Sequence, residues 1–227
     1  MSITDLRKIP CRSCGEEVLA VTIESANPAR HPPFQEQLLD RELLKMACPH
    51  CDAEHRHYDR FTWIDLPGLL CAVVLHESER PDWPELELEA LRELSVPLRE
   101  EGPPFVRAFG ETVSIRLVFG LEELREKVVC RIHDLDDRVI EAIKEELPYG
   151  STLDSAERGM SLTFRDGDKR WLDVAWQELE DAAARREELA SELPGLFDPR
   201  AAWVNAGRSR RAPLRHDDAV APSEQTN

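Results

Sequence analysis

Runs of apolar and alternating residues predict a series of short β-strands in the first half of the chain. Apolar residues concentrate in four stretches bounded by turn-forming or charged residues, which favours strands over residues 16–24, 43–47, 53–64 and 69–76. A fifth strand is predicted over 112–119, where apolar and polar positions alternate. A short helix over 34–40 is expected directly after Pro32 and Pro33, because proline favours the first turn of a helix.

Two amphipathic helices are predicted after the fifth strand. Residues 121–129 carry leucine and valine at helical spacing. A second helix is predicted over 134–147, with Asp134 as its N-cap and further aspartates in its first turn. Its apolar positions share one side: Leu135, Val139, Ile140, Ile143 and Leu147.

An acidic stretch separates the fourth and fifth predicted strands. Residues 77–101 contain nine carboxylates and three arginines. Leu86, Leu91 and Leu94 are spaced as on one side of a helix over 85–94. Because most of the stretch is charged, we expect a solvated, linker-like helix at the edge of a subdomain.

The last third of the chain predicts a small α+β appendix. Strands are expected at 161–165 and 170–174, followed by a helix over 175–190. The final residues offer little to bury and are predicted to be disordered. The whole pattern predicts an α+β protein in three parts, a domain over 1–147, the appendix over 151–206 and a tail over 207–227.

The charge balance restricts the kinds of partner. The 227 residues include 45 Asp and Glu against 29 Lys and Arg, for a formal net charge of −16. The electrostatic field of so negative a chain repels phosphate backbones and anionic lipids. We therefore expect a protein partner rather than nucleic acid or a membrane. The longest apolar run, 69–75, has seven residues, whereas a spanning helix needs about 20. The first residues also lack the apolar centre of a secretion signal, and we expect a soluble, cytoplasmic protein.

Four cysteines form two matched pairs, Cys11-Arg-Ser-Cys14 and Cys48-Pro-His-Cys51. Each pair places two thiolates on one tight turn, and two facing turns complete a tetrahedron around Zn²⁺. The 33 residues between the pairs exceed those of a compact ribbon, but this adds only about 0.5 kcal/mol of loop-closure entropy. We therefore predict one structural Zn²⁺ per chain, bound by Cys11, Cys14, Cys48 and Cys51.

The residues beside these cysteines suit the turns. Gly15 can adopt positive φ, and Asp52 holds the equivalent position, which aspartate tolerates better than most residues. The alternatives to a metal are a redox-active dithiol and buried free thiols. Four thiolates leave no open coordination position for water, which argues against an enzyme. The cysteines thus predict a zinc-ribbon-like β module with two metal-binding turns.

The order of these features resembles a known family. The first CxxC pair is followed by a strand ending in Glu24-Ser-Ala-Asn27, a proline-interrupted insert, Cys48-Pro-His-Cys51, an aromatic strand and an apolar strand. Much later come Phe119-Gly-Leu-Glu-Glu-Leu-Arg and Leu135-Asp-Asp-Arg-Val-Ile-Glu. Over about residues 9–147 this pattern resembles the CpXC domain family of bacteria and archaea, although Arg12 replaces the proline of the first motif. The resemblance implies a zinc-bound bacterial domain with the four cysteines as ligands. Because the function of the family is uncharacterised, the resemblance says little about activity.

A second set of potential metal ligands follows Cys51. His55, His57 and Asp59 alternate along a predicted strand, so they would point to one face. Two imidazoles and a carboxylate could hold a second metal with open positions, as a metal-dependent enzyme requires. The same face continues into Trp63, so a strand face that turns from solvent to core is the simpler interpretation.

The opposite face of that predicted strand carries Arg56, Tyr58 and Arg60. Such residues could stack bases and hold phosphates in a nucleic-acid-binding ribbon. Residues 1–60, however, contain eight basic and ten acidic side chains, so no basic surface supports this function. The two remaining cysteines, Cys71 and Cys130, lie in apolar runs and are predicted to be buried and unreactive.

These observations lead to one principal hypothesis. The chain is expected to be a non-catalytic, structural-zinc module that acts in protein–protein interaction in a bacterial cytoplasm. The alternatives are a metal-dependent enzyme that uses His55, His57 and Asp59, and a ribbon-type nucleic-acid binder. The sequence specifies neither the partner nor the oligomeric state.

Overall fold

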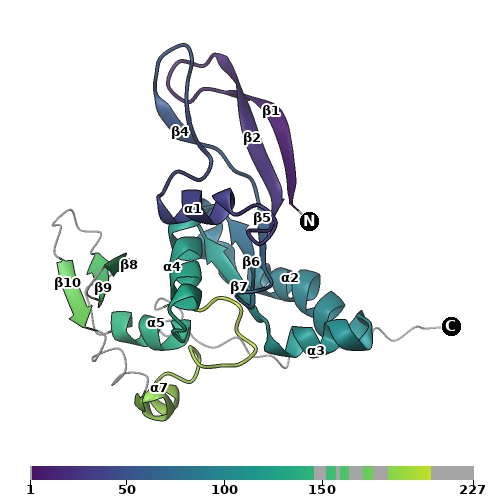
Figure 1. Ribbon diagram of the computed structural model, residues 1–227, viewed down its shortest axis with the longest axis vertical. Helices are drawn as coiled ribbons and strands as arrows, with labels where there is room; N and C mark the ends of the chain where they lie inside the picture. The colour runs from purple at the N-terminus through teal and green to yellow at the C-terminus, as the bar shows by residue number, and fades with distance from the viewer. Residues whose placement is uncertain (1, 146–151, 157–158, 164–170, 176–183, 206–227) are drawn as a thin grey trace.

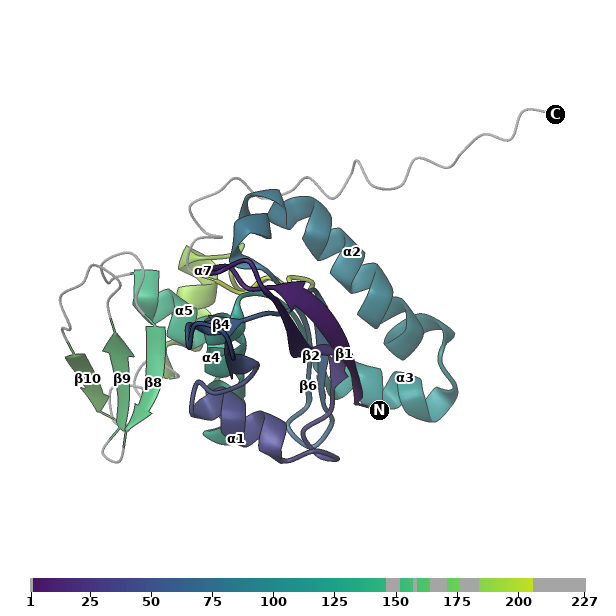
Figure 2. The same cartoon turned by 90° about the horizontal axis from the view of Figure 1, so that it is seen from above.

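The structure of the chain, a computed structural model, describes residues 2–145, 152–156, 159–163, 171–175 and 184–205. A five-stranded sheet with the strand order β1-β2-β5-β6-β7 lies between two helical layers, and the β1–β2 hairpin projects beyond them (Figures 1 and 2). The strands of this sheet are β1 (Ile3–Pro10), β2 (Glu17–Ala26), β5 (Phe61–Asp65), β6 (Leu70–Leu75) and β7 (Ser114–Phe119).

Strand directions in this sheet are mixed. The pairs β1–β2 and β5–β6 are antiparallel, whereas β2–β5 and β6–β7 are parallel. A parallel pair needs a crossover connection, which α2 and α3 supply between β6 and β7. The helices are α1 (Pro33–Leu39), a 3₁₀ helix (Glu77–Asp82), α2 (Trp83–Ser95), a π-helical segment (Val96–Glu101), α3 (Pro104–Thr112), α4 (Leu121–Ile132), α5 (Asp137–Glu145) and α7 (Arg186–Glu192). None of the helices in the described ranges is long and apolar enough to cross a membrane.

The central strand β6 is buried on both faces of the sheet, which explains its continuous apolar run. Helices α1 and α4 cover one face, with a core of Ile23, Ala26, Leu38, Leu43, Phe61, Trp63, Leu70, Ala72, Val74, Val118, Leu121, Leu124 and Val128. Helix α2 covers the other face, with a core of Cys71, Val73, Leu75, Trp83, Ala90, Val113, Ile115, Leu117, Phe119, Ala202 and Trp203.

Helix α2 corrects one sequence-based expectation. The predicted helix over 85–94 is confirmed in position, but its description as a solvated linker is wrong. Trp83 and Ala90 are buried against the sheet, and Leu86 packs beside them. The prediction was wrong because it relied on the number of charges in the whole stretch. The apolar residues lie together on one side of the helix, and that side is buried.

Most other predicted elements of the first 132 residues are confirmed. These are the strands over 16–24, 43–47, 69–76 and 112–119 and the helices over 34–40 and 121–129, observed as β2, β3, β6, β7, α1 and α4. The single strand over 53–64 is wrong, because β4 (Glu54–Arg56) belongs to a hairpin with β3 (Lys45–Ala47) and β5 belongs to the large sheet. Strand β1 was not predicted, since nearly all its residues are exposed and no buried face marks it.

Helix α5 begins later than predicted. It starts at Asp137, and Asp134, the expected N-cap, has φ of 54° and lies outside the helix. The carboxylate of Asp136 instead accepts the N–H of Arg138 at 3.0 Å. The cap is therefore Asp136, two residues beyond the expected position.

The predicted appendix contains a three-stranded antiparallel sheet with the order β10-β9-β8. Its strands are β8 (Thr152–Ala156), β9 (Gly159–Thr163) and β10 (Trp171–Ala175). The predicted strands over 161–165 and 170–174 overlap β9 and β10, and β8 was not predicted. Residues 176–183 of the predicted helix and the predicted disordered tail over 207–227 lie outside the described residues.

The chain after α7 returns to the large sheet. The carbonyl of Ala202 accepts the N–H of Leu117 in β7 at 2.9 Å. One carboxylate oxygen of Glu87 in α2 accepts the N–H groups of Ala202 and Trp203 at 2.7 and 2.8 Å. The Trp203 ring packs on that of Trp83, with centroids 4.7 Å apart. Residues beyond the predicted first domain thus complete its core, and the predicted division into domains stays a prediction.

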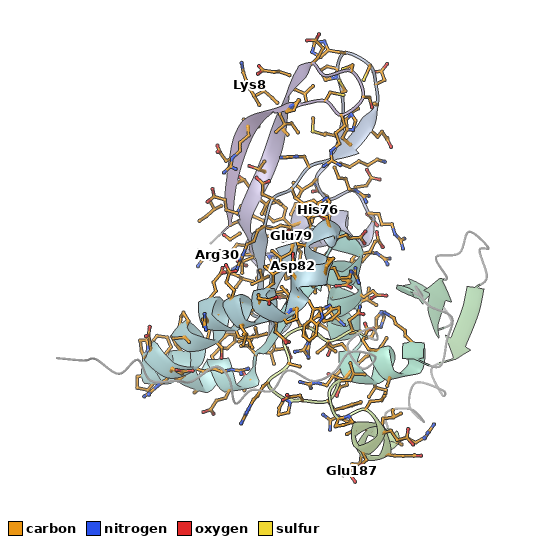
Figure 3. The ribbon with its side chains drawn as sticks, turned by 180° about the vertical axis from the view of Figure 1, so that it is seen from behind. Lys8, Arg30, His76, Glu79, Asp82 and Glu187 are labelled. Atoms are coloured by element: carbon orange, nitrogen blue, oxygen red, sulfur yellow. The ribbon has the colours of Figure 1, made fainter. Side chains whose placement is uncertain are left out.

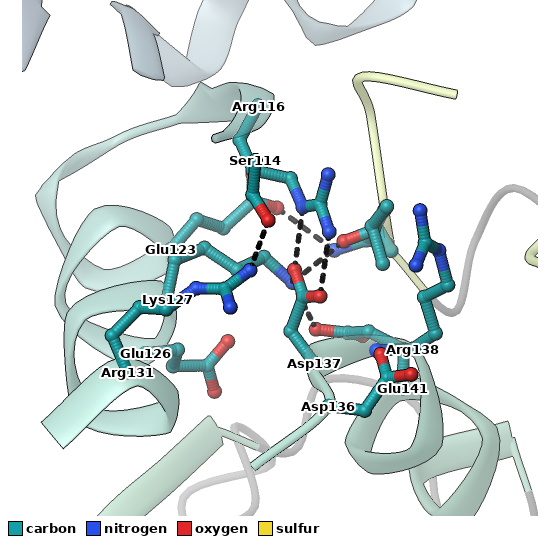
Figure 4. A network of polar contacts seen from close by, with 12 residues as sticks. Ser114, Arg116, Glu123, Glu126, Lys127, Arg131, Asp136, Asp137, Arg138 and Glu141 are labelled. Atoms are coloured by element: carbon teal, nitrogen blue, oxygen red, sulfur yellow. Dashed lines mark hydrogen bonds and ion pairs between the residues drawn. The ribbon is translucent and has the colours of Figure 1, made fainter. Parts of the chain in front are cut away.

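A charged network lies between β7, α4 and α5 (Figure 4). Its six buried side chains are Arg116, Glu126, Lys127, Asp137, Glu141 and Lys144. Arg116 binds both carboxylate oxygens of Asp137, at 2.7 and 2.8 Å. The Lys127 ammonium lies 3.5 Å from Asp137 and 3.0 Å from Glu141. Three cations and three anions balance one another, which burial of charge requires.

We predict that Asp137→Asn destabilises the protein strongly. The substitution leaves Arg116 and Lys127 buried beside a neutral group, so the free energy of unfolding should fall by about 3–5 kcal/mol in urea titrations. Glu188→Gln, in an exposed pair with Arg185, should cost less than about 1 kcal/mol. Equal losses in the two variants would contradict this assignment.

The same carboxylate predicts a pH dependence. Burial alone would raise the pKa of Asp137, but the charges of Arg116 and Lys127 lower this pKa well below its ordinary value. The resulting stabilisation is complete above the unfolded pKa of about 3.9 and is lost as the pH falls through the folded pKa. The difference in unfolding free energy between wild type and Asp137→Asn should therefore shrink between about pH 5 and about pH 2. A constant difference over that range would show that Asp137 is not the titrating group.

Candidate metal centre

Two hairpins bring the four paired cysteines together at one end of the molecule (Figure 1). Cys11 and Cys14 lie in the turn that joins β1 to β2. Cys48 and Cys51 lie in the turn that joins β3 to β4. The hairpins are antiparallel, so each turn reverses the chain and presents its two thiols at the tip.

The two turns have the same backbone hydrogen bonds. The N–H of Gly15 donates to the carbonyl of Cys11, and the N–H of Asp52 donates to the carbonyl of Cys48, each at 2.9 Å. Gly15 has φ of 80° and Asp52 has φ of 55°, which confirms the positive φ expected of both. The matching geometry allows each turn to present its thiols in the same way.

Backbone N–H groups point at the sulfur atoms. The backbone nitrogens of Ser13 and Cys14 lie 3.4 and 3.5 Å from the sulfur of Cys11. The backbone nitrogen of His50 lies 3.4 Å from the sulfur of Cys48. The N–H of Cys14, with that of Ser13, lowers the pKa of Cys11 to about 5, although burial acts in the opposite direction. These donors favour the thiolate, which is the form that binds metal.

The four sulfur atoms have the spacing of a tetrahedral site. All lie within 4.8 Å of one another, and the Cys11–Cys51 and Cys14–Cys48 sulfur pairs are each 3.7 Å apart. A tetrahedron with metal–sulfur bonds of about 2.3 Å has edges of about 3.8 Å. The cluster could therefore hold a metal ion at its centre without rearrangement.

Little apolar surface supports the two turns. Cys11 and Cys48 are buried together with Val18, and Ile9 and Met46 are only partly buried beside them. Cys14 and Cys51 are exposed. So small a core cannot hold two hairpins together alone, which is the usual situation of a structural metal site.

His55 lies beside this cluster instead of in a second one. Its Nε2 atom is 3.0 Å from the Cys11 sulfur, within reach of an N–H···S contact. Asp59 instead forms an ion pair with Arg7 at 3.3 Å. The alternative of a second metal site at His55, His57 and Asp59 is not supported, because the chain leaves the strand after Arg56 and the three side chains do not gather at one point. In the ranges that the structure describes, the four cysteines are the one group with metal-binding spacing.

The alternative of a nucleic-acid-binding face at Arg56, Tyr58 and Arg60 gains no support from their contacts. Arg60 forms ion pairs with Glu89 and Glu93 of α2, which neutralise its charge. Arg56 donates to the carbonyl of Arg41. Tyr58 packs edge-to-face on Phe61 at the border of the core. These side chains are occupied within the protein and form no open platform for bases.

Cys71 and Cys130 are buried, as predicted. Burial raises the pKa of Cys71 to about 11 and that of Cys130 to about 12. Both thiols therefore remain protonated near neutral pH, and they behave as small apolar residues of the core.

Comparison with known proteins agrees with this geometry. Residues 9–144 match the model of the CpXC protein family. No curated protein and no solved structure matches the chain. The matched segment contains both cysteine turns and the large sheet and extends into α5, which is well over half of the sequence. The chain therefore belongs to the CpXC protein family.

Proposed function

We propose that Cys11, Cys14, Cys48 and Cys51 bind one Zn²⁺ and that this ion has a structural role. Thiolate ligands favour zinc over harder divalent ions, and zinc accepts four sulfurs in the tetrahedral spacing described above. Four protein ligands occupy every coordination position, so no water can be activated. The ion joins the β1–β2 hairpin to the β3–β4 hairpin.

We further propose that the zinc-bound hairpins act in protein–protein interaction, in a bacterial cytoplasm where thiols stay reduced. One observation carries this proposal. Leu6 and Leu19 are each 65% exposed and Val21 is 51% exposed, and Leu6 is the cross-strand partner of Val21. We name these three side chains the hairpin patch. Exposed apolar side chains that adjoin on one rigid surface are typical of a binding site for another protein.

A groove next to the hairpin patch supports the same proposal. It lies between the two hairpins, and its lining combines the apolar side chains of Leu19, Met46 and Pro49 with the charged side chains of Lys8 and Glu17. Apolar walls with charged groups at the rim are the usual composition of a protein-binding surface. Zinc would fix the distance between the two sides of this groove.

Metal analysis tests the structural role. The purified protein should contain one zinc per chain, and Cys48→Ser/Cys51→Ser should lose it and lower the midpoint of thermal unfolding. Cys71→Ala, which removes a buried thiol outside the cluster, should keep the metal. A wild-type protein that is metal-free and fully folded would overturn the proposal.

His55 should tune the affinity for zinc without being a ligand. A hydrogen bond to a metal-bound thiolate is an outer-sphere contact, and loss of such a contact lowers metal affinity by about 10–100-fold. His55→Ala should therefore retain one zinc but release it to a competing chelator at lower concentration. His50→Ala, an exposed residue in the Cys48 turn, is the matched control and should behave as wild type. Unchanged affinity in His55→Ala would show that this contact does not act on the metal.

A further inference from the structure

Strand β1 is an edge strand of the large sheet, and no strand of the described residues pairs with its outer side. It pairs with β2 and stands last in the strand order, and its residues are exposed along nearly its whole length. Figure 3 shows Lys8 on the outer side of the hairpin, away from the helical layers. An edge of eight residues with few obstructions is a template for pairing with another strand.

Three contacts show which residues of β1 direct their backbone groups outward. The N–H of Cys11 donates to the carbonyl of Glu16 across the hairpin, and the side-chain hydroxyl of Thr22 donates to the carbonyl of Asp5. In the antiparallel register of β1 and β2, the backbone groups of the odd-numbered residues of β1 therefore face β2. The N–H of Leu6 is bound by the neighbouring carboxylate of Asp5 and not by β2. Because the direction alternates along a strand, the N–H and carbonyl groups of Thr4, Leu6 and Lys8 point outward at the edge. The Leu6 N–H would exchange the Asp5 carboxylate for a carbonyl of a strand that pairs there.

We propose that β1 pairs antiparallel with β1 of a second copy of this chain, with Leu6 opposite Leu6 on a two-fold axis. This inference rests on the zinc-bound hairpin of the proposed function and names its partner. In this register Thr4 lies opposite Lys8 of the second copy, and the outward backbone groups of both strands meet. The two-fold axis makes the interface isologous, as in most dimers of identical chains.

Charge selects this register over its neighbours. With Leu6 at the centre, Asp5 of each copy faces Arg7 of the other, which gives two opposite-charge pairs. A shift that centres on Asp5 brings two aspartates together, and a shift that centres on Arg7 brings two arginines together. Like charges directly opposite one another destabilise a sheet. In the single chain Arg7 forms ion pairs with Asp5, Glu24 and Asp59 at 3.2–3.3 Å. Pairing across the axis would exchange the contact with its own Asp5 for one with Asp5 of the other copy.

The distribution of net charge permits the association. The whole chain carries a net charge of −16, but residues 1–60 contain eight basic and ten acidic side chains, a net charge of −2. Residues 1–60, which include the hairpin, therefore repel a second copy less than the strongly acidic chain as a whole would suggest. Pairing would also place the two hairpin patches side by side, so Leu6, Leu19 and Val21 of each copy form one apolar surface.

The opposite edge of the sheet limits the assembly to two copies. Along β7, Leu117 donates to Ala202, so residues after α7 occupy that edge within the described chain. A sheet with one covered edge can grow only at the other. Pairing through β1 therefore closes after one step and does not build a filament.

Charge exchange tests the register directly. Wild-type protein, measured by light scattering after gel filtration across a dilution series, should show twice the chain mass of 25.9 kDa. Asp5→Arg alone and Arg7→Asp alone should each be monomeric, because each places like charges opposite one another. An equimolar mixture of the two variants should recover the dimer, since every pair across the axis is then of opposite charge. Arg107→Asp, at an exposed position of α3, changes the net charge equally and should remain dimeric.

The outcomes separate this proposal from the structural role of zinc. A zinc-loaded, folded wild type that stays monomeric at every concentration overturns the dimer and leaves the zinc site standing. A dimer that survives both single variants, or a mixture that fails to associate, overturns the β1 register. Circular dichroism and zinc content of each variant distinguish a lost interface from a lost fold. Metal-free, folded protein instead overturns the proposed function.

Discussion

The arrangement of the amino-terminal part depends on the convergence of four sulfur atoms from two distant turns. Thirty-three residues separate the cysteine pairs in the sequence, yet all four sulfurs lie within 4.8 Å of one another. Few apolar groups surround them, so packing alone offers little to keep the hairpins together. Four thiolates in so small a volume would repel one another strongly unless a cation lies between them. A metal ion bound there and the geometry of the two hairpins would therefore stabilise each other.

The metal site and the large sheet share a strand. Strand β2 leaves the first cysteine turn and, ten residues later, pairs with β5 in the body of the protein. An interaction that fixes the cysteine turn at the tip of this hairpin therefore also orients the hairpin patch and the outer edge of β1. A rigid projecting strand pair loses little conformational entropy when it meets a partner, which favours association. An ion bound by the cysteines would therefore act, through the hairpin itself, on the hairpin patch and on the edge of β1.

Buried ion pairs, and not a metal site, connect the elements in the body of the protein. Three buried cations and three buried anions join β7, α4 and α5, and each has an oppositely charged neighbour within hydrogen-bonding distance. Such networks contribute specificity of packing more clearly than net stability. The excess of negative charge lies outside this network and outside the hairpins, so an acidic chain retains both a neutral core and a nearly neutral edge.

Local spacing in the sequence determined the α+β class, the four-cysteine cluster, and the positions of β2, α1, β6, β7 and α4, because turn chemistry and burial periodicity act over a few residues. Tertiary contacts decided the rest. Strand β1 has no buried face to reveal it, and His55 reaches Cys11 only through the meeting of two hairpins. Asp137 was expected only as a first-turn residue of its helix, and its burial beside Arg116, twenty-one residues earlier, could not be predicted from local sequence. Such outcomes depend on long-range pairing, and no local pattern encodes which distant residue will be the partner.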